Sequence, residues 1–130
     1  MKVVFGTNIY VSAFVIPNSQ AEKAVLKVIE GNDLLIISKE IIDEVLTVLS
    51  VKFSRDREAI SHTAFYLSDI TRVVKPSRKI HVFKDEPDNR ILECTITGKA
   101  DVIVTGDKEV LKLREFEGIK IISLKEYLKL

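Results

Sequence analysis

The stretch VIVTGDKEVLKL, residues 102–113, contains the pattern from which the fold can be argued. Its first residues, Val102–Val104, are β-branched and apolar, which predicts a short buried strand. Gly106 opens a turn, and Asp107 is a plausible N-cap because its carboxylate can accept hydrogen bonds from the free N–H groups that begin a helix. The apolar residues that follow indicate a short helix. The stretch therefore predicts a strand followed directly by a helix.

The same alternation of short apolar strands with helices continues on both sides of this stretch. Further strands are predicted at Lys2–Phe5, Leu34–Ile37 and Lys120–Ile122, with a strand-like connection at Thr71–Val74. The predicted helices are Ala21–Glu30, a helix capped by Ser38 with an apolar stripe from Ile41 to Leu49, Arg55–Ile70, Pro87–Thr97 and Leu124–Leu130. We expect Gly31 and Gly98 to end two of these helices. The alternation predicts an α/β fold with a mostly parallel central sheet.

The composition is that of one soluble globular domain, residues 1–130. The chain has 20 Lys and Arg against 19 Asp and Glu, a formal net charge of +1, and 46% hydrophobic residues. This balance excludes a histone-like basic arm, an acidic tail and a strong overall field. The single cysteine, Cys94, cannot form an internal disulfide and is expected to be a packing residue.

No targeting or membrane segment is recognisable in the sequence. The apolar residues at the start are too few for a signal peptide, and no apolar run approaches the ~18 residues that cross a bilayer. We therefore expect a cytoplasmic protein. The glycine patterns of dinucleotide-binding folds and of P-loop NTPases are also absent, which argues against both classes of enzyme.

Carboxylates occupy the positions where ligands of open α/β sheets bind, beyond the carboxyl ends of the strands. Asp88 lies on the predicted inward face of its helix, Glu44 borders the apolar stripe of another, and Asp107 follows a strand. Each also has a structural explanation: Asp85 and Asp88 resemble a capping box, Asp107 an N-cap, and Glu44 a flanking acid that reaches solvent. Together, hard oxygen ligands without a His or Cys cluster suit Mg²⁺ or Mn²⁺ better than zinc.

Four motifs in register then resemble those of a single family. These are Val3-Val4-Phe5-Gly6-Thr7-Asn8, Ser38-Lys39-Glu40-Ile41-Ile42-Asp43-Glu44, Asp85-Glu86-Pro87-Asp88-Asn89-Arg90-Ile91-Leu92-Glu93 and Ala100-Asp101-Val102-Ile103-Val104-Thr105-Gly106-Asp107-Lys108. In order and spacing they resemble the PIN-domain family, and most closely its toxin components of VapBC-type toxin–antitoxin pairs. The similarity covers essentially the whole chain. It implies an α/β/α sandwich and Mg²⁺- or Mn²⁺-dependent cleavage of RNA by water.

The resemblance also assigns roles to individual residues. Glu44, Asp88 and Asp107 fall on the acid positions of the family, which are catalytic and bind metal, and Asp85 is a peripheral acid. Asn8 matches a polar position of the catalytic site, while Thr7 and Thr105 match supporting positions. An RNA substrate, a cognate antitoxin protein and a homodimer are implied in the same way, and no membrane.

One position departs from the family pattern. The first strand of the family ends in an aspartate directly before Thr-Asn, and Gly6 stands there in this chain. Gly6 has no obvious local duty, although a positive φ or close approach of a ligand would require glycine. Without this acid, three carboxylates balance two divalent cations less well than four. We therefore hypothesise a ribonuclease whose activity is weakened or lost.

The clearest basic stretch without acids leads directly into Asp85. Lys75, Arg78, Lys79 and Lys84 could guide RNA phosphates toward the metal site, although a solvated connection has the same composition. His62 is expected on a helix surface.

Two other functions compete with the nuclease hypothesis. A non-catalytic PIN-like module would keep the fold in order to bind an antitoxin or RNA. A receiver-like phosphotransfer domain also gathers acids at strand ends, but it predicts a phosphorylatable Asp at a central strand end and a Lys near the last strand. The predicted strand ends supply neither convincingly.

Overall fold

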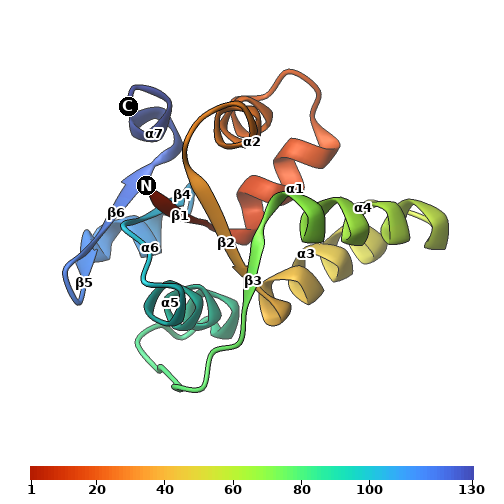
Figure 1. Ribbon diagram of the computed structural model, residues 1–130. Coiled ribbons are helices and arrows are strands. Elements are labelled where there is room, and N and C mark those ends of the chain that lie inside the picture. Colours follow the sequence, from red (N-terminus) through yellow and green to blue (C-terminus); the bar gives the residue numbers. More distant parts are fainter.

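The computed structural model describes residues 1–130 and contains one six-stranded sheet in the order β3-β2-β1-β4-β6-β5 (Figure 1). The strands are β1 (Lys2–Phe5), β2 (Leu34–Ser38), β3 (Arg72–Val74), β4 (Val102–Thr105), β5 (Glu115–Phe116) and β6 (Ile119–Ser123). All neighbouring strands are parallel except the short β5, which pairs antiparallel with β6. The predicted α/β class with a mostly parallel sheet is therefore confirmed.

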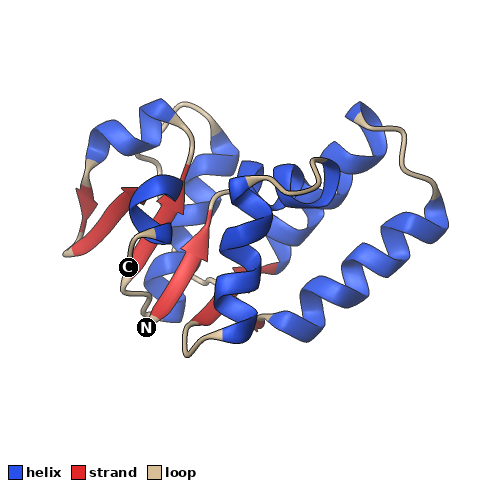
Figure 2. Ribbon diagram, turned by 90° about the horizontal axis from the view of Figure 1, so that it is seen from above, coloured by secondary structure: helices blue, strands red, loops and turns tan.

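Seven helices surround the sheet, and most begin at a residue whose side chain caps them. They are α1 (Thr7–Val15), α2 (Gln20–Glu30), α3 (Lys39–Lys52), α4 (Arg57–Ile70), α5 (Glu86–Gly98), α6 (Lys108–Leu113) and α7 (Leu124–Leu128). Helices α2 and α7 lie on one side of the sheet and α5 on the other (Figures 1 and 2). The α3–α4 pair extends away from the sheet. No helix has the length and apolar character needed to cross a membrane.

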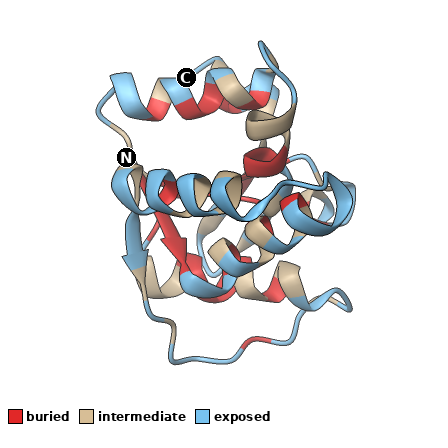
Figure 3. Cartoon of the chain, turned by 90° about the vertical axis from the view of Figure 1, so that its right-hand side faces the viewer, coloured by how far each residue is buried: buried red, intermediate tan, exposed pale blue.

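The core forms where the central strands meet the apolar stripes of the helices. The side chains of Val3, Val4 and Phe5 on β1 are completely buried, and so is the run Leu35–Ile37 on β2. Because these strands are covered on both faces, they are continuously apolar and do not alternate with polar residues. Buried residues accordingly concentrate on the strands and on the inward sides of the helices (Figure 3).

Two elements were not predicted from the sequence. Helix α1 has no alternation of apolar and polar faces, since Ile9, Tyr10 and Val11 are all buried and most of its remaining residues are half-buried. Its N-cap is Gly6, which has no side chain to make a capping bond. Strand β5 has only two residues, too few for a period-2 pattern.

Helix α5 ends at Gly98 as predicted, but this glycine does not supply the left-handed turn. Gly98 is the last residue of α5, and the chain turns at Lys99, which adopts the left-handed conformation with φ +53°. Gly98 serves another purpose: a Cβ built on it would lie 2.6 Å from Cγ2 of Ile36 on β2. The glycine therefore allows α5 to approach the sheet closely.

Replacement of Gly98 by alanine should therefore lower the stability of the protein. The added methyl group overpacks the contact with Ile36, and we expect the free energy of unfolding to fall by about 1–3 kcal/mol in urea denaturation. Gly106→Ala is the matched control, because nothing lies within 4 Å of its Cβ position, and it should change stability by less than about 0.5 kcal/mol. Equal stability of the two variants would contradict the close approach.

Candidate active site

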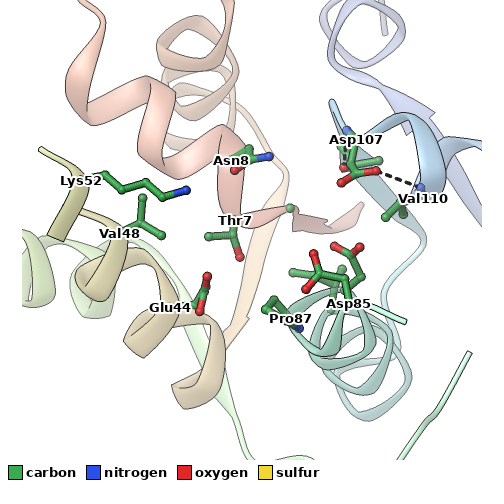
Figure 4. A pocket seen from close by; sticks show the side chains of 13 residues that line it. Thr7, Asn8, Glu44, Val48, Lys52, Asp85, Pro87, Asp107 and Val110 are labelled. Carbon is green, nitrogen blue, oxygen red and sulfur yellow. Dashed lines mark hydrogen bonds between the residues drawn. The ribbon is translucent and has the colours of Figure 1, made fainter. Parts of the chain in front are cut away.

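A cavity of about 280 Å³ opens at the carboxyl ends of the central parallel strands. All eight residues that the sequence assigned to the metal site and its support line this cavity: Gly6, Thr7, Asn8, Glu44, Asp85, Asp88, Thr105 and Asp107. Glu44 lies on one side, on α3, whereas Asp85 and Asp107 lie on the opposite side (Figure 4). The sequence therefore predicted which side chains come together.

The pairing of β1 with β4 brings two of the four motifs side by side. Val3, Val4 and Phe5 pair with Val102, Ile103 and Val104, and the Gly6 N–H continues the ladder by donating to the Val104 carbonyl at 2.8 Å. The chain then leaves both strands at the same edge of the sheet. As a result Thr7 and Asn8, at the start of α1, line the same cavity as Thr105 and Asp107.

Helix α3 presents a row of side chains to the cavity. The Ser38 hydroxyl accepts a hydrogen bond from the Ile41 N–H at 3.3 Å and fixes the first turn of the helix. One stripe of α3 packs into the core, and the adjacent row, spaced by four residues, is Glu44, Val48 and Lys52. Glu44 is half-buried and points across the cavity (Figure 4).

The capping-box explanation of Asp85 and Asp88 is wrong. Asp85 is the N-cap of α5, but its side chain makes no capping hydrogen bond, and only its backbone carbonyl accepts, from the Asp88 N–H at 3.1 Å. Both carboxylates therefore stay available to the cavity. Asp88 is half-buried, one turn before the buried Ile91 and Leu92.

The two carboxylate oxygens of Asp107 differ in their hydrogen bonds. Its Oδ1 accepts hydrogen bonds from the N–H groups of Glu109, at 2.8 Å, and Val110, at 3.3 Å, so the predicted N-cap is confirmed. Its Oδ2 has no hydrogen bond within the chain. The backbone N–H of Asp107 donates to the hydroxyl of buried Thr105 at 3.1 Å, which fixes the turn. Capping and a place in the cavity are thus compatible.

Two neighbouring acids act on the Asp88 carboxyl. Burial, followed by the negative charges of Asp107 and Asp85, raises the pKa of the Asp88 carboxyl to about 6 from its ordinary 3.8. A group of this kind is stabilised by a nearby cation.

Gly6 lines the same cavity as these acids and is buried. Its φ of −64° and ψ of 152° are extended, so a positive φ is not what requires glycine here. A Cβ at this position would lie 3.0 Å from the Thr105 Oγ1, a tight contact, so the Thr105 side chain would have to move by a few tenths of an ångström. The backbone angles themselves are ones that an aspartate adopts.

The donor set fits a divalent cation of the magnesium type only in part. All the acids lining the cavity offer hard oxygen ligands, as Mg²⁺ and Mn²⁺ prefer. However, no three Asp, Glu, His or Cys side chains lie close enough together to hold one ion. The residues fit an ion held by one or two carboxylates and completed by water, which is common for Mg²⁺, and they do not fit a three-carboxylate site.

The predicted basic stretch does not line the cavity. Lys75, Arg78, Lys79 and Lys84 are all exposed, and the Arg78 guanidinium is engaged by Glu117 through two hydrogen bonds of 2.9 and 2.7 Å. Their role in RNA binding stays a prediction. The cation that lines the cavity is Lys52. It was not singled out from the sequence, because it lies outside the basic stretch at residues 75–84.

Two buried polar residues of α5 were also missed. The Asn89 amide oxygen accepts from the N–H groups of Val82, at 3.0 Å, and Phe83, at 2.8 Å. Glu93 accepts from the Ile80 N–H at 2.9 Å. They therefore attach the connection before Asp85 to the helix that carries Asp88. Their spacing of four on an apolar helix face was the available signal.

Cys94 and His62 lie where the sequence predicted. The Cys94 side chain is completely buried, and this burial raises the pKa of its thiol to about 12, so the thiol stays protonated. His62 is exposed on α4 and does not line the cavity.

Comparisons with known proteins agree with this geometry. A family model described as PIN domain matches residues 2–109. An uncharacterised protein of Methanocaldococcus jannaschii is 28% identical over 119 residues, which cover 88% of this chain and 76% of that protein.

Two solved structures superpose on this chain with a TM-score of 0.67 each. VapBC2 from Rickettsia felis, bound to a DNA fragment from its promoter, is 16% identical, with 95% of this chain and 98% of the other covered. VapBC-1 from nontypeable Haemophilus influenzae is 14% identical, with 96% and 99% covered. At these identities the two structures show the fold alone.

The raised pKa of Asp88 predicts a pH-dependent stability. Folding takes up a proton between about pH 4 and 6, so the free energy of unfolding falls as the pH rises through this window and stays lower above it. Asp88→Asn removes the repelled charge and should stabilise the chain by about 1 kcal/mol at pH 7.5, after a discount for solvent screening. The difference should vanish at pH 4.

Urea denaturation at the two pH values measures this effect. Asp69→Asn, which changes an exposed carboxylate on α4 that has no ion pair, is the control and should show no such difference. A variant Asp88→Asn that is less stable than the parent chain at pH 7.5 would mean that a favourable partner, and not repulsion, surrounds this carboxylate.

Proposed function

The chain belongs to the PIN domain family, and on that premise we propose that it is a toxin-type endoribonuclease that hydrolyses RNA phosphodiester bonds with Mg²⁺ or Mn²⁺, its activity lowered by Gly6. The observation that carries the proposal is the meeting of Glu44, Asp88 and Asp107, from three separate elements, around one cavity at the carboxyl ends of the strands. The fold shared with two VapBC structures supports the toxin type.

In this proposal the acids have distinct tasks. Asp88 and Asp107 would hold the cation, because the charge of Asp107 already acts on the Asp88 carboxyl. A bound divalent cation would neutralise the negative charge that develops on the phosphate during hydrolysis. Asp107 offers Oδ2 for this task, since Oδ1 caps α6. Asp85 adds negative charge at the rim.

The remaining residues of the cavity orient the reactants. Glu44 projects from the opposite wall, where it can hold the attacking water and accept its proton. The Asn8 amide can donate a hydrogen bond to a phosphate oxygen, and the Thr7 hydroxyl lies between Asn8 and Glu44 (Figure 4). Thr105 acts indirectly by fixing the turn that carries Asp107.

Gly6 lowers activity in this proposal because it stands where a carboxylate would line the cavity. With an acid there, the end of β1 would supply the third ligand that the present side chains do not provide. A lost metal ligand should cost at least the ~10–100-fold typical of changes beyond the metal's direct ligands. The fold itself does not depend on the acid, since Gly6 caps α1 with ordinary backbone angles.

Gly6→Asp should therefore raise the ribonuclease activity at least about tenfold. The assay is cleavage of labelled RNAs of varied sequence with Mg²⁺ or Mn²⁺, with EDTA abolishing it. Gly6→Ala is the matched control, because it adds the same Cβ contact with Thr105 but no carboxylate, and it should give no gain. Adding Glu44→Gln to Gly6→Asp should remove the gained activity. Inert Gly6→Asp on every RNA would contradict a nuclease.

A second candidate is a non-catalytic PIN module that binds an antitoxin or RNA. The absence of any three-ligand group around the cavity favours it. An antitoxin partner fits both candidates and is supported by the VapBC structures of the same fold. Tight partner binding by a chain that stays inert as Gly6→Asp would establish this alternative. A homodimer and a cytoplasmic location remain predictions.

A further inference from the structure

The negative charge of the cavity opposes the entry of an RNA strand. Four carboxylates line the cavity, and they repel phosphate groups. Lys52 is the cation among the lining residues. It is the last residue of α3, two turns beyond Glu44 on the same row of the helix. It therefore stands at the edge of the cavity, away from the acids of α5 and α6.

The ammonium group of Lys52 is available to an anion. None of the ion pairs in the chain includes it, whereas Lys39, at the other end of α3, is paired with Asp43 at 3.1 Å. Its side chain extends toward Asn8 and into the cavity (Figure 4). A lysine held by neither Glu44 nor any other acid can bind a phosphate at no cost in existing contacts.

An aromatic residue and a second cation follow Lys52 directly in the chain. Phe53 is the C-cap of α3 and is 43% exposed. Arg55 is positioned by a hydrogen bond of 3.3 Å from its Nη2 to the Phe14 carbonyl. The negative charge of Asp56 is engaged by the N-terminus of α4, where its Oδ1 accepts from the Ala59 N–H at 2.8 Å. An aromatic ring among cations is the usual platform for unpaired nucleic acid.

We infer that the RNA strand leaves the cavity over the C-terminal end of α3, with Lys52 on a phosphate next to the one that is cleaved and Phe53 stacked on a base. The inference rests on the proposed function. The stacking contact requires an unpaired segment of RNA, because a base inside a duplex cannot stack on a side chain. The connection at residues 75–84 is a poorer path, since it does not line the cavity and its Arg78 is occupied by Glu117.

Binding in the absence of metal tests this path without relying on cleavage. We would measure the anisotropy of a fluorescein-labelled single-stranded RNA of about eight nucleotides in EDTA, over a range of KCl concentrations. Lys52→Met should weaken binding and lower the slope of log affinity against log salt by about 0.7, the value for one phosphate contact of a single strand. Lys52→Arg should retain the slope.

Phe53→Ala should act differently. Loss of one stacked base weakens binding by about 5- to 150-fold and leaves the salt slope unchanged. Phe53→Tyr should keep the affinity. The matched controls are Lys23→Met, an exposed lysine of α2 without an ion pair, and Phe65→Ala, whose side chain is 78% exposed on α4. Both should bind as the parent chain does, and a blunt-ended RNA duplex should bind more weakly than the single strand.

Several results would overturn the inference. These are no binding of RNA by the parent chain, an unchanged salt slope in Lys52→Met, or equal affinity for duplex and single strand. If the variants leave RNA binding intact but turn an oligomer into a monomer in sedimentation, the surface is an interface between copies. The nuclease proposal fails separately: an inert Gly6→Asp together with weaker RNA binding by the Lys52 and Phe53 variants leaves the strand path standing.

Discussion

The parallel pairing of β1 with β4 brings together two segments from opposite ends of the chain. Their hydrogen bonds end at the same edge of the sheet, where the Gly6 N–H donates to the Val104 carbonyl. The cavity depends on this register: α1 begins two residues after the end of β1, α6 begins three residues after the end of β4, and residues at both helix starts line the cavity. Because the register of a buried sheet cannot slip without exposing its apolar residues, the relative position of the two motifs is as secure as the core itself.

Helix α5, which also lines the cavity, is held in place by other interactions. Helix α5 carries Asp88 near its N-terminus, and its position depends on the contact of Gly98 with Ile36 and on the hydrogen bonds of Asn89 and Glu93. These interactions hold the Asp88 carboxylate in a place where burial and neighbouring negative charges raise its pKa. The core therefore supplies the stability that offsets the repulsion in the cavity. Such a balance is typical of sites that bind a charged ligand.

Much of this arrangement could be predicted from the sequence, because the signals were local. The apolar runs of β1, β2 and β4 and the helix stripes predicted the α/β class, and the parallel sheet then required the strand-end acids to meet. Helix α1 escaped prediction because it is buried on nearly every side and has no polar face. The position of Lys52 in the cavity was not predicted, because it depends on the direction of α3. The hydrogen bonds of Asn89 were not predicted, because its partners lie in a connection without regular structure.

Asp107 and position 6 differ in what their replacement would cost the molecule. Asp107 caps α6 through one oxygen, so its replacement would remove two hydrogen bonds at the start of that helix. Position 6 has no such role, since the backbone there is ordinary and glycine satisfies it. The side chain at position 6 can therefore change without the loss of a helix cap. The two positions differ in that one carboxylate is tied to the start of a helix, whereas the residue at the end of β1 is not.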